Sequence, residues 1–187
     1  MSLRRPAVVI ALTSITAVIA LALPAGAAQV SIKQYVNSVC TSLTTFQDDV
    51  EGLSEQFQAA VASQTDLEVV KSEFVNLFDS LLVTAQNLNA DLQAAGTPKI
   101  ANGGKIASSL RQGISDMESV ISDARDDASA LSTANRPQFV NEVQDLEDSL
   151  NDAFDIIGDG FDDLDKKYDT RKLEAAQKKD PDCSALN

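Results

Sequence analysis

The chain has 187 residues, of which 28 are Asp or Glu and 15 are Lys or Arg, so its formal net charge is −13. A surface of this charge repels nucleic acids and anionic lipid headgroups, and we expect the protein to bind neither. The chain also lacks histidine. That absence excludes Ser-His and Cys-His catalytic pairs and metal sites of the helical Glu-x-x-His type.

The first 28 residues have the three parts of a secretory signal peptide. Arg4 and Arg5 supply a basic start, residues 7–23 form an apolar run, and the Ala-Gly-Ala motif at 25–27 fits a signal-peptidase site. We therefore predict export, to the cell envelope or out of the cell. An uncleaved N-terminal anchor is the alternative, because an apolar run of about 17 residues is at the lower limit for spanning a bilayer.

The mature chain, residues 29–187, begins with a segment whose apolar residues recur at alternating steps of four and three. They are Ile32, Val36, Val39, Leu43, Phe46, Val50, Leu53, Phe57 and Ala60. This seven-residue period places one apolar seam along a helix, with polar side chains between the seam positions. It predicts a long amphipathic helix from about residue 31 to residue 62.

The second segment is predicted to be a helix that begins near Thr65. Thr65 and Glu68 have the spacing of a capping box, in which a hydroxyl and a carboxylate satisfy two free amides reciprocally. Gly96 is expected to end this helix, because glycine adopts the left-handed conformation common at helix ends. The glycines at 103 and 104 predict a flexible hinge before the next segment.

Two further apolar stripes follow, at residues 106–131 and 139–168, the last one fading towards residue 177. Asn135 is expected to cap the last helix, with Pro137 in its first turn. Short connections between long helices imply antiparallel neighbours. The sequence therefore predicts an all-α protein with a single domain, an antiparallel up-down-up-down four-helix bundle of long amphipathic helices.

Cys40 and Cys183 are the two cysteines of the chain, and we predict that they form a disulfide because export leads to an oxidising compartment. Two unrelated buried thiols, or a metal-binding pair, are the alternatives. The up-down topology brings the end of the last helix towards the start of the first. A straight last helix would overshoot Cys40, so we expect a kink or break near Gly158–Gly160, or a tail after Lys178 that doubles back.

The densest acidic stretch covers residues 152–165. Its candidate ligands for a hard divalent cation are Asp155, Asp159, Asp162 and Asp163. The match to a calcium loop fails where Ile157 and Lys166 stand in place of oxygen ligands, so a solvated acidic face is the favoured interpretation. No glycine-rich phosphate loop occurs either. We predict no catalysis and no cofactor.

These exclusions favour a non-catalytic protein-interaction or accessory subunit, a monomer whose partner is an envelope or extracellular protein. One alternative is a carrier of a lipid or other apolar ligand, with the connection at 96–105 as a lid. The other alternative is a weak divalent-cation binder that uses the acidic residues at 152–165.

The leader, the stretch YVNSVCTSL around Cys40 and the terminal DPDCSAL resemble small exported helical-bundle proteins of unknown function from high-GC Gram-positive bacteria. The resemblance is one of layout and covers most of the chain. It implies an extracytoplasmic location and paired cysteines, and it implies no activity.

Overall fold

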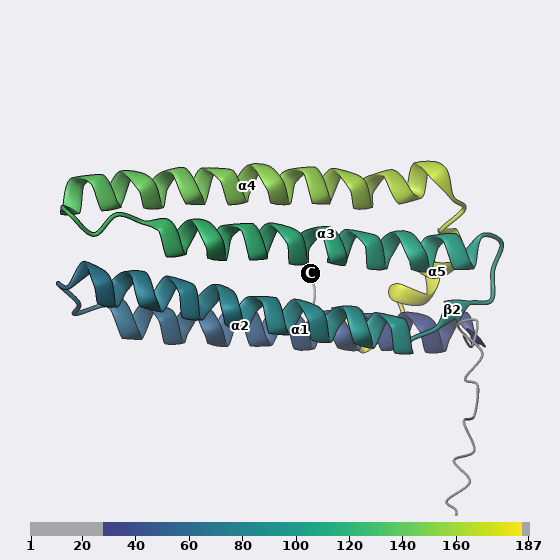
Figure 1. The fold of residues 1–187 in the computed structure, drawn as a ribbon. Helices are drawn as coiled ribbons and strands as arrows, with labels where there is room; N and C mark the ends of the chain where they lie inside the picture. Colours follow the sequence, from purple (N-terminus) through teal and green to yellow (C-terminus); the bar gives the residue numbers. More distant parts are fainter. Residues whose placement is uncertain (1–27, 185–187) are drawn as a thin grey trace, which may run out of the picture.

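The computed structural model describes residues 28–184, except for the side chains of residues 156, 157 and 159–165. The described part is mostly helical, which confirms the all-α prediction. Figure 1 shows the long helices side by side with the short elements at one end. The helices are α1 (Ile32–Val61), α2 (Leu67–Ala94), α3 (Gly103–Ala130), α4 (Arg136–Lys167), α5 (Arg171–Gln177) and α6 (Pro181–Ser184), and the strands are β1 (Gln29–Val30) and β2 (Thr97–Pro98).

Side-chain caps mark the starts of α1, α2 and α4. Asn135 caps α4 as predicted, because its side-chain oxygen accepts a hydrogen bond from the N–H of Gln138 at 3.0 Å. The prediction of a capping box at the start of α2 was wrong. Asp66 caps α2 instead, accepting from the N–H of Glu68 at 3.0 Å. A carboxylate caps as well as a hydroxyl does, and the Glu68 carboxylate accepts from the Thr133 hydroxyl beyond α3.

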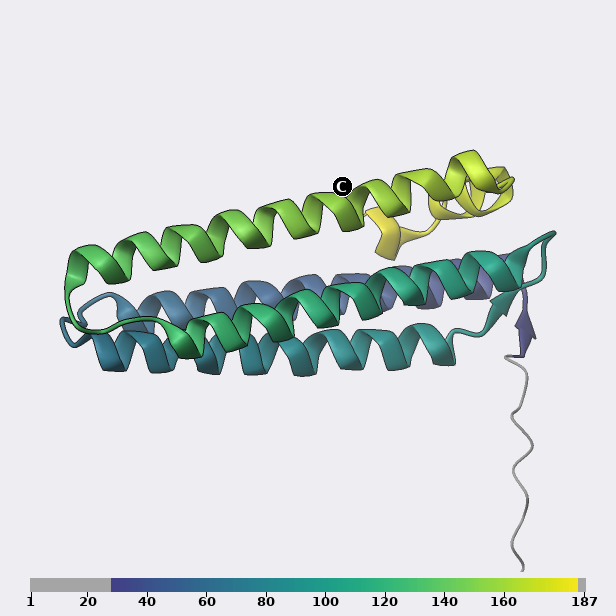
Figure 2. The ribbon, with the colours of Figure 1, turned by 45° about the horizontal axis from the view of Figure 1, so that its top comes forward.

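Each long helix packs against the next one in the chain: α1 on α2, α2 on α3, and α3 on α4. Figure 2 shows α4 along the outer side of this group. Helices α1 and α2 approach the backbone of α4 at no more than a few residues. The short helices α5 and α6 pack on α1 instead. The end of the chain therefore joins its beginning through these two helices and not through α4.

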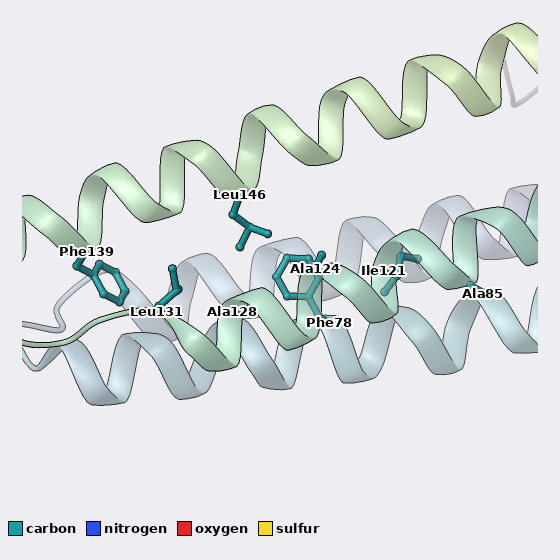
Figure 3. Close-up of a cluster of buried hydrophobic side chains, with 8 residues drawn as sticks. All are labelled: Phe78, Ala85, Ile121, Ala124, Ala128, Leu131, Phe139 and Leu146. Carbon is teal, nitrogen blue, oxygen red and sulfur yellow. The ribbon is translucent and has the colours of Figure 1, made fainter.

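The main core lies where α2, α3 and α4 face one another (Figure 3). Its buried members are Phe78, Ala85, Ile121, Ala124, Ala128, Leu131, Phe139 and Leu146. Ala85 and Ala128 have no exposed surface. Small side chains at these positions let neighbouring helices approach closely, while each buried Phe or Leu contributes about 1.5–3 kcal/mol to the free energy of folding. The core thus consists of the apolar stripes expected from the sequence.

A two-stranded parallel sheet, which the sequence did not predict, ties residues 28–30 to the connection between α2 and α3. The N–H of Thr97 donates to the carbonyl of Ala28 at 3.1 Å, and the N–H of Lys99 donates to the carbonyl of Val30 at 2.9 Å. Strands of two residues are too short to show alternation. The expected hinge at Gly103–Gly104 was also wrong, since both glycines lie in the first turn of α3.

Helix α4 runs without interruption through Gly158–Gly160, so the break predicted there was wrong. The chain leaves the helix at Tyr168 and turns back over Asp169 and Thr170. Glycine lowers helix stability by about 1 kcal/mol relative to alanine, and this cost does not break a helix whose backbone hydrogen bonds continue on both sides. The doubling back that the cysteine pair required is therefore present, but it begins after Lys167.

An uninterrupted α4 predicts that Gly158→Ala stabilises the protein by about 0.5–1 kcal/mol. A methyl group at this position would meet no atom within 4 Å, and the residue is exposed. The alanine therefore removes backbone freedom from the unfolded chain without a clash. Urea unfolding followed by circular dichroism measures the change. Gly52→Ala in α1, another glycine with open space around it, is the matched control and should give a similar gain. A loss at Gly158 alone would show a kink there.

Candidate functional site

The predicted pair of cysteines is joined. Cys40 of α1 and Cys183 of α6 form a disulfide with their Cα atoms 4.9 Å apart. Both cysteines are buried, in a cluster with Tyr35, Val36 and Ala107. Burial also raises the pKa of the Tyr35 phenol, an effect that the charge of Arg111 opposes. The bond is compatible with an extracytoplasmic location, and its burial indicates a structural role.

Residues 168–184, which we call the C-terminal hook, carry Cys183 to this position. Asp169 accepts two hydrogen bonds from the Arg171 guanidinium, at 2.7 and 2.8 Å, which lowers the pKa of Asp169 to about 2. Asp180 is buried and caps α6 by accepting from the N–H of Asp182 at 3.1 Å. Pro181 follows the cap, where its missing amide costs nothing. The Asp-Pro pair is the signal from which sequence reasoning could have predicted α6.

In addition to the disulfide, polar side chains of α1 hold the hook in place. Asp182 accepts hydrogen bonds from the hydroxyl of Thr41 at 2.7 Å and from the amide of Asn37 at 3.2 Å. Thr44 donates its hydroxyl to the backbone carbonyl of Asp182 at 3.2 Å. These contacts lie one turn apart along α1, so they fix the register of the hook on that helix.

Of the four predicted cation ligands, the structure describes the side chain of Asp155 alone. Asp155 is exposed on α4. The side chains of Asp159, Asp162 and Asp163 lie outside the described residues. Within the described part, no three acidic or cysteine side chains are placed so that they could share a metal ion.

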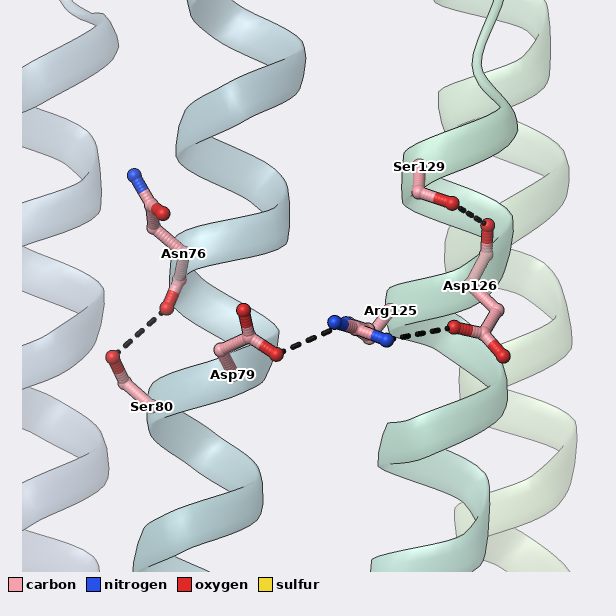
Figure 4. A network of polar contacts seen from close by, with 6 residues as sticks. All are labelled: Asn76, Asp79, Ser80, Arg125, Asp126 and Ser129. Atoms are coloured by element: carbon pink, nitrogen blue, oxygen red, sulfur yellow. Dashed lines mark hydrogen bonds and ion pairs between the residues drawn. The ribbon is translucent and has the colours of Figure 1, made fainter.

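An ion-pair network crosses from α2 to α3 (Figure 4). The guanidinium of Arg125 lies 3.0 Å from the Asp79 carboxylate of α2 and 3.1 Å from that of Asp126. The hydrogen bond to Asp126 and the charge of Asp79 raise the pKa of Arg125. All three side chains are well exposed, so solvent screens these ion pairs and they are expected to add little to the stability of the fold.

The surface between α3 and α4 contains two shallow hollows, of about 220 and 180 Å³. Asp127, Leu146 and Ser149 line both of them, so the hollows adjoin, and together we call them the α3–α4 groove. Along α4 it extends from Glu142 to Ala153, which is about 16 Å or three helical turns. Sequence reasoning did not find this groove.

The lining of the α3–α4 groove divides into an apolar floor and an acidic rim. The apolar lining that keeps some exposed surface consists of Val120, Ala130, Leu150 and Ala153, with the buried Leu131 and Leu146 beneath it, and the rim consists of Asp123, Asp127, Glu142 and Asp145. Every charged residue of the lining is a carboxylate. The groove therefore offers apolar contact along its length and negative charge at its edges.

Glu142 differs from the other rim residues because its carboxylate already accepts hydrogen bonds within the protein. It accepts from the N–H of Ser132 at 2.5 Å and from the amide of Gln138 at 2.8 Å. These two hydrogen bonds, with a smaller contribution from the charge of Lys71, hold the pKa of Glu142 below its usual value of 4.5. By contrast, the carboxylates of Asp123, Asp127 and Asp145 make no hydrogen bond or ion pair with the described residues.

The lowered pKa of Glu142 predicts how Glu142→Gln changes stability with pH. A carboxylate whose pKa is lower in the folded state stabilises that state above the unfolded pKa, and this stabilisation is lost as pH falls through the folded value. The wild-type protein should therefore exceed the variant in unfolding free energy near pH 6, and the difference should shrink below pH 4.5. Urea unfolding at a series of pH values measures it. Gln144→Glu, an exposed change on the same helix, is expected to show no such trend.

A third hollow, of about 260 Å³, lies between α1 and α2 beside Phe57. Phe57 fills part of this region by packing against Phe74 of α2, with ring centroids 4.7 Å apart. Its lining includes one charged residue, Glu73. This hollow is shorter than the α3–α4 groove, and its lining has one carboxylate where that of the groove has four.

No family model, curated protein or solved structure matches this chain. Among residues 28–184, no helix combines the length and apolar character that crossing a bilayer requires.

Proposed function

We propose that the protein is a secreted or cell-envelope, non-catalytic interaction subunit. Its four long helices would work as one antiparallel bundle that presents the α3–α4 groove to a partner protein. The observation that carries the proposal is the groove itself, an apolar surface about three helical turns long whose edge carboxylates Asp123, Asp127 and Asp145 have no partner among the described residues. The leader pattern supports the location, and the disulfide is compatible with it.

The carrier alternative has less support. The three hollows described above have volumes of about 180–260 Å³, whereas pockets that enclose a small molecule usually measure about 300–1,000 Å³. A bundle that carries a lipid would also have to open, and in the described part the connection proposed as its lid is tied to β1 by backbone hydrogen bonds.

The proposal is tested by photocrosslinking in the producing cells. A photoreactive phenylalanine analogue replaces Ser149, which is exposed and lines both hollows of the groove. The control carries the same analogue at Gln86, an exposed position of α2. We expect one dominant protein adduct from position 149, none of the same mass from position 86, and loss of co-purification of that protein when Ser149 is replaced by Trp. The same adducts from both positions, or none from either, would refute the proposal.

A further inference from the structure

The α3–α4 groove also indicates what kind of segment the partner presents. We infer that its occupant is a cationic amphipathic helix of another protein, with an apolar stripe for the floor and Lys or Arg side chains for the rim. This inference rests on the proposed function, because it concerns the same surface.

Charge complementarity is the first argument. The free rim carboxylates, Asp123 and Asp127 of α3 and Asp145 of α4, have no cationic partner among the described residues. Asp123 and Asp127 are also four residues apart on one helix, a spacing at which like charges repel. A cation placed between them removes this repulsion and adds attraction. A neutral or acidic segment would leave the carboxylates partly desolvated and unpaired, which is unfavourable.

The shape of the groove is the second argument. It follows two helices for about three turns, and partly exposed apolar side chains, among them Ala130, Leu150 and Ala153, lie along it. A helix laid between two others presents residues at spacings of three and four to such a floor. Its flanking positions then reach the rim on both sides, because long Lys and Arg side chains extend their charge away from their apolar stems.

Other occupants fit these observations less well. A second copy of this chain carries the same net charge of −13 and would bring carboxylates to carboxylates. Anionic lipid is repelled for the same reason. A single metal ion does not fit either, because the rim carboxylates are spread along the groove and no three acidic residues of the described part converge on one point.

Two synthetic peptides of about 18 residues, or five helical turns, test the inference. The first has leucines at helical spacing on one face and lysines beside them, and the second has the same composition with the leucines dispersed around the helix. Binding to the disulfide-bonded protein is measured by fluorescence anisotropy at low and physiological salt. We expect the first peptide to bind at least about tenfold more tightly than the second, since only the first can cover the apolar floor.

Two triple variants with the same change in net charge locate the binding site. Asp123→Asn, Asp127→Asn and Asp145→Asn remove the free carboxylates of the rim. The controls Asp48→Asn, Asp49→Asn and Asp91→Asn remove exposed carboxylates of α1 and α2. The rim variant should weaken binding of the first peptide by about tenfold or more, and the control variant by less than about twofold.

Equal weakening by the two triple variants, or no preference for the first peptide, would overturn the inference. The proposed function is judged separately, by the adduct at position 149. A partner captured there through an acidic or uncharged segment would leave the function standing and refute the cationic helix. Absence of any adduct would refute the function, whatever the peptides do.

Discussion

Replacement of both cysteines, Cys40→Ala with Cys183→Ala, is expected to lower the free energy of unfolding by up to about 5 kcal/mol. The bond joins residues 143 positions apart, and such a link removes many conformations from the unfolded chain. For a domain of this size the loss corresponds to a fall in melting temperature of roughly 10–20 °C. Denaturant and thermal unfolding of residues 29–187 measure both quantities.

The single variants provide the internal check on this prediction. Cys40→Ala and Cys183→Ala each remove the whole bond, so each should lose about as much stability as the double variant, and the effects should not add. Wild-type protein unfolded under reducing conditions should behave like them. A loss below about 1 kcal/mol would contradict the prediction. It would show that the contacts of Thr41, Asn37 and Thr44 with the hook suffice to hold the chain end.

Substitution of Gly103 by Ala is expected to destabilise the protein by about 3 kcal/mol or more. Gly103 is buried in the first turn of α3, and a Cβ atom added there would lie 2.0 Å from the backbone carbonyl oxygen of Pro98. Pro98 is itself fully buried and belongs to β2, so neither partner can move without disturbing the sheet. Urea unfolding, with amide exchange of Thr97 and Lys99 to report on the sheet, measures the effect.

The neighbouring glycine supplies a matched control. At Gly104 an added Cβ would approach its nearest neighbour, a methyl group of Thr97, at an ordinary 4.0 Å. Gly104→Ala should therefore be neutral or stabilise by up to about 1 kcal/mol, because alanine favours the helix. If both variants behaved alike, the close packing of α3 on β2 would be refuted.

The C-terminal hook explains how a chain with an outlying α4 keeps its two ends together. Helix α4 packs on α3, while α5 and α6 pack on α1. Helix α4 is thus fastened at one end by the turn at 131–135 and at the other by the hook. The α3–α4 groove lies between these two points. Loss of the disulfide should therefore loosen the packing of α4 around the groove as well as destabilise the fold.

Much of the fold follows from local patterns in the sequence. The seven-residue spacing on α1 and the stripes of α2, α3 and α4 predicted the long helices, because helical periodicity is a property of neighbouring residues. Asn135 identified the start of α4 for the same reason. The disulfide was predicted from the expected compartment and from the cysteine count, and helix order made the pairing geometrically reasonable.

Other features depend on residues far apart in the chain, and only the tertiary structure decided them. The Thr133 hydroxyl donates a hydrogen bond to Glu68, and the N–H of Thr97 donates one to the carbonyl of Ala28. The hook turns back after Lys167 and is held on α1 through Asp182. The α3–α4 groove is likewise a property of two helices at a particular separation. Its carboxylates were visible in the sequence only as part of a generally acidic surface. Periodicity specifies which face of a helix is buried, whereas packing decides which neighbour covers that face and which part stays open to a partner.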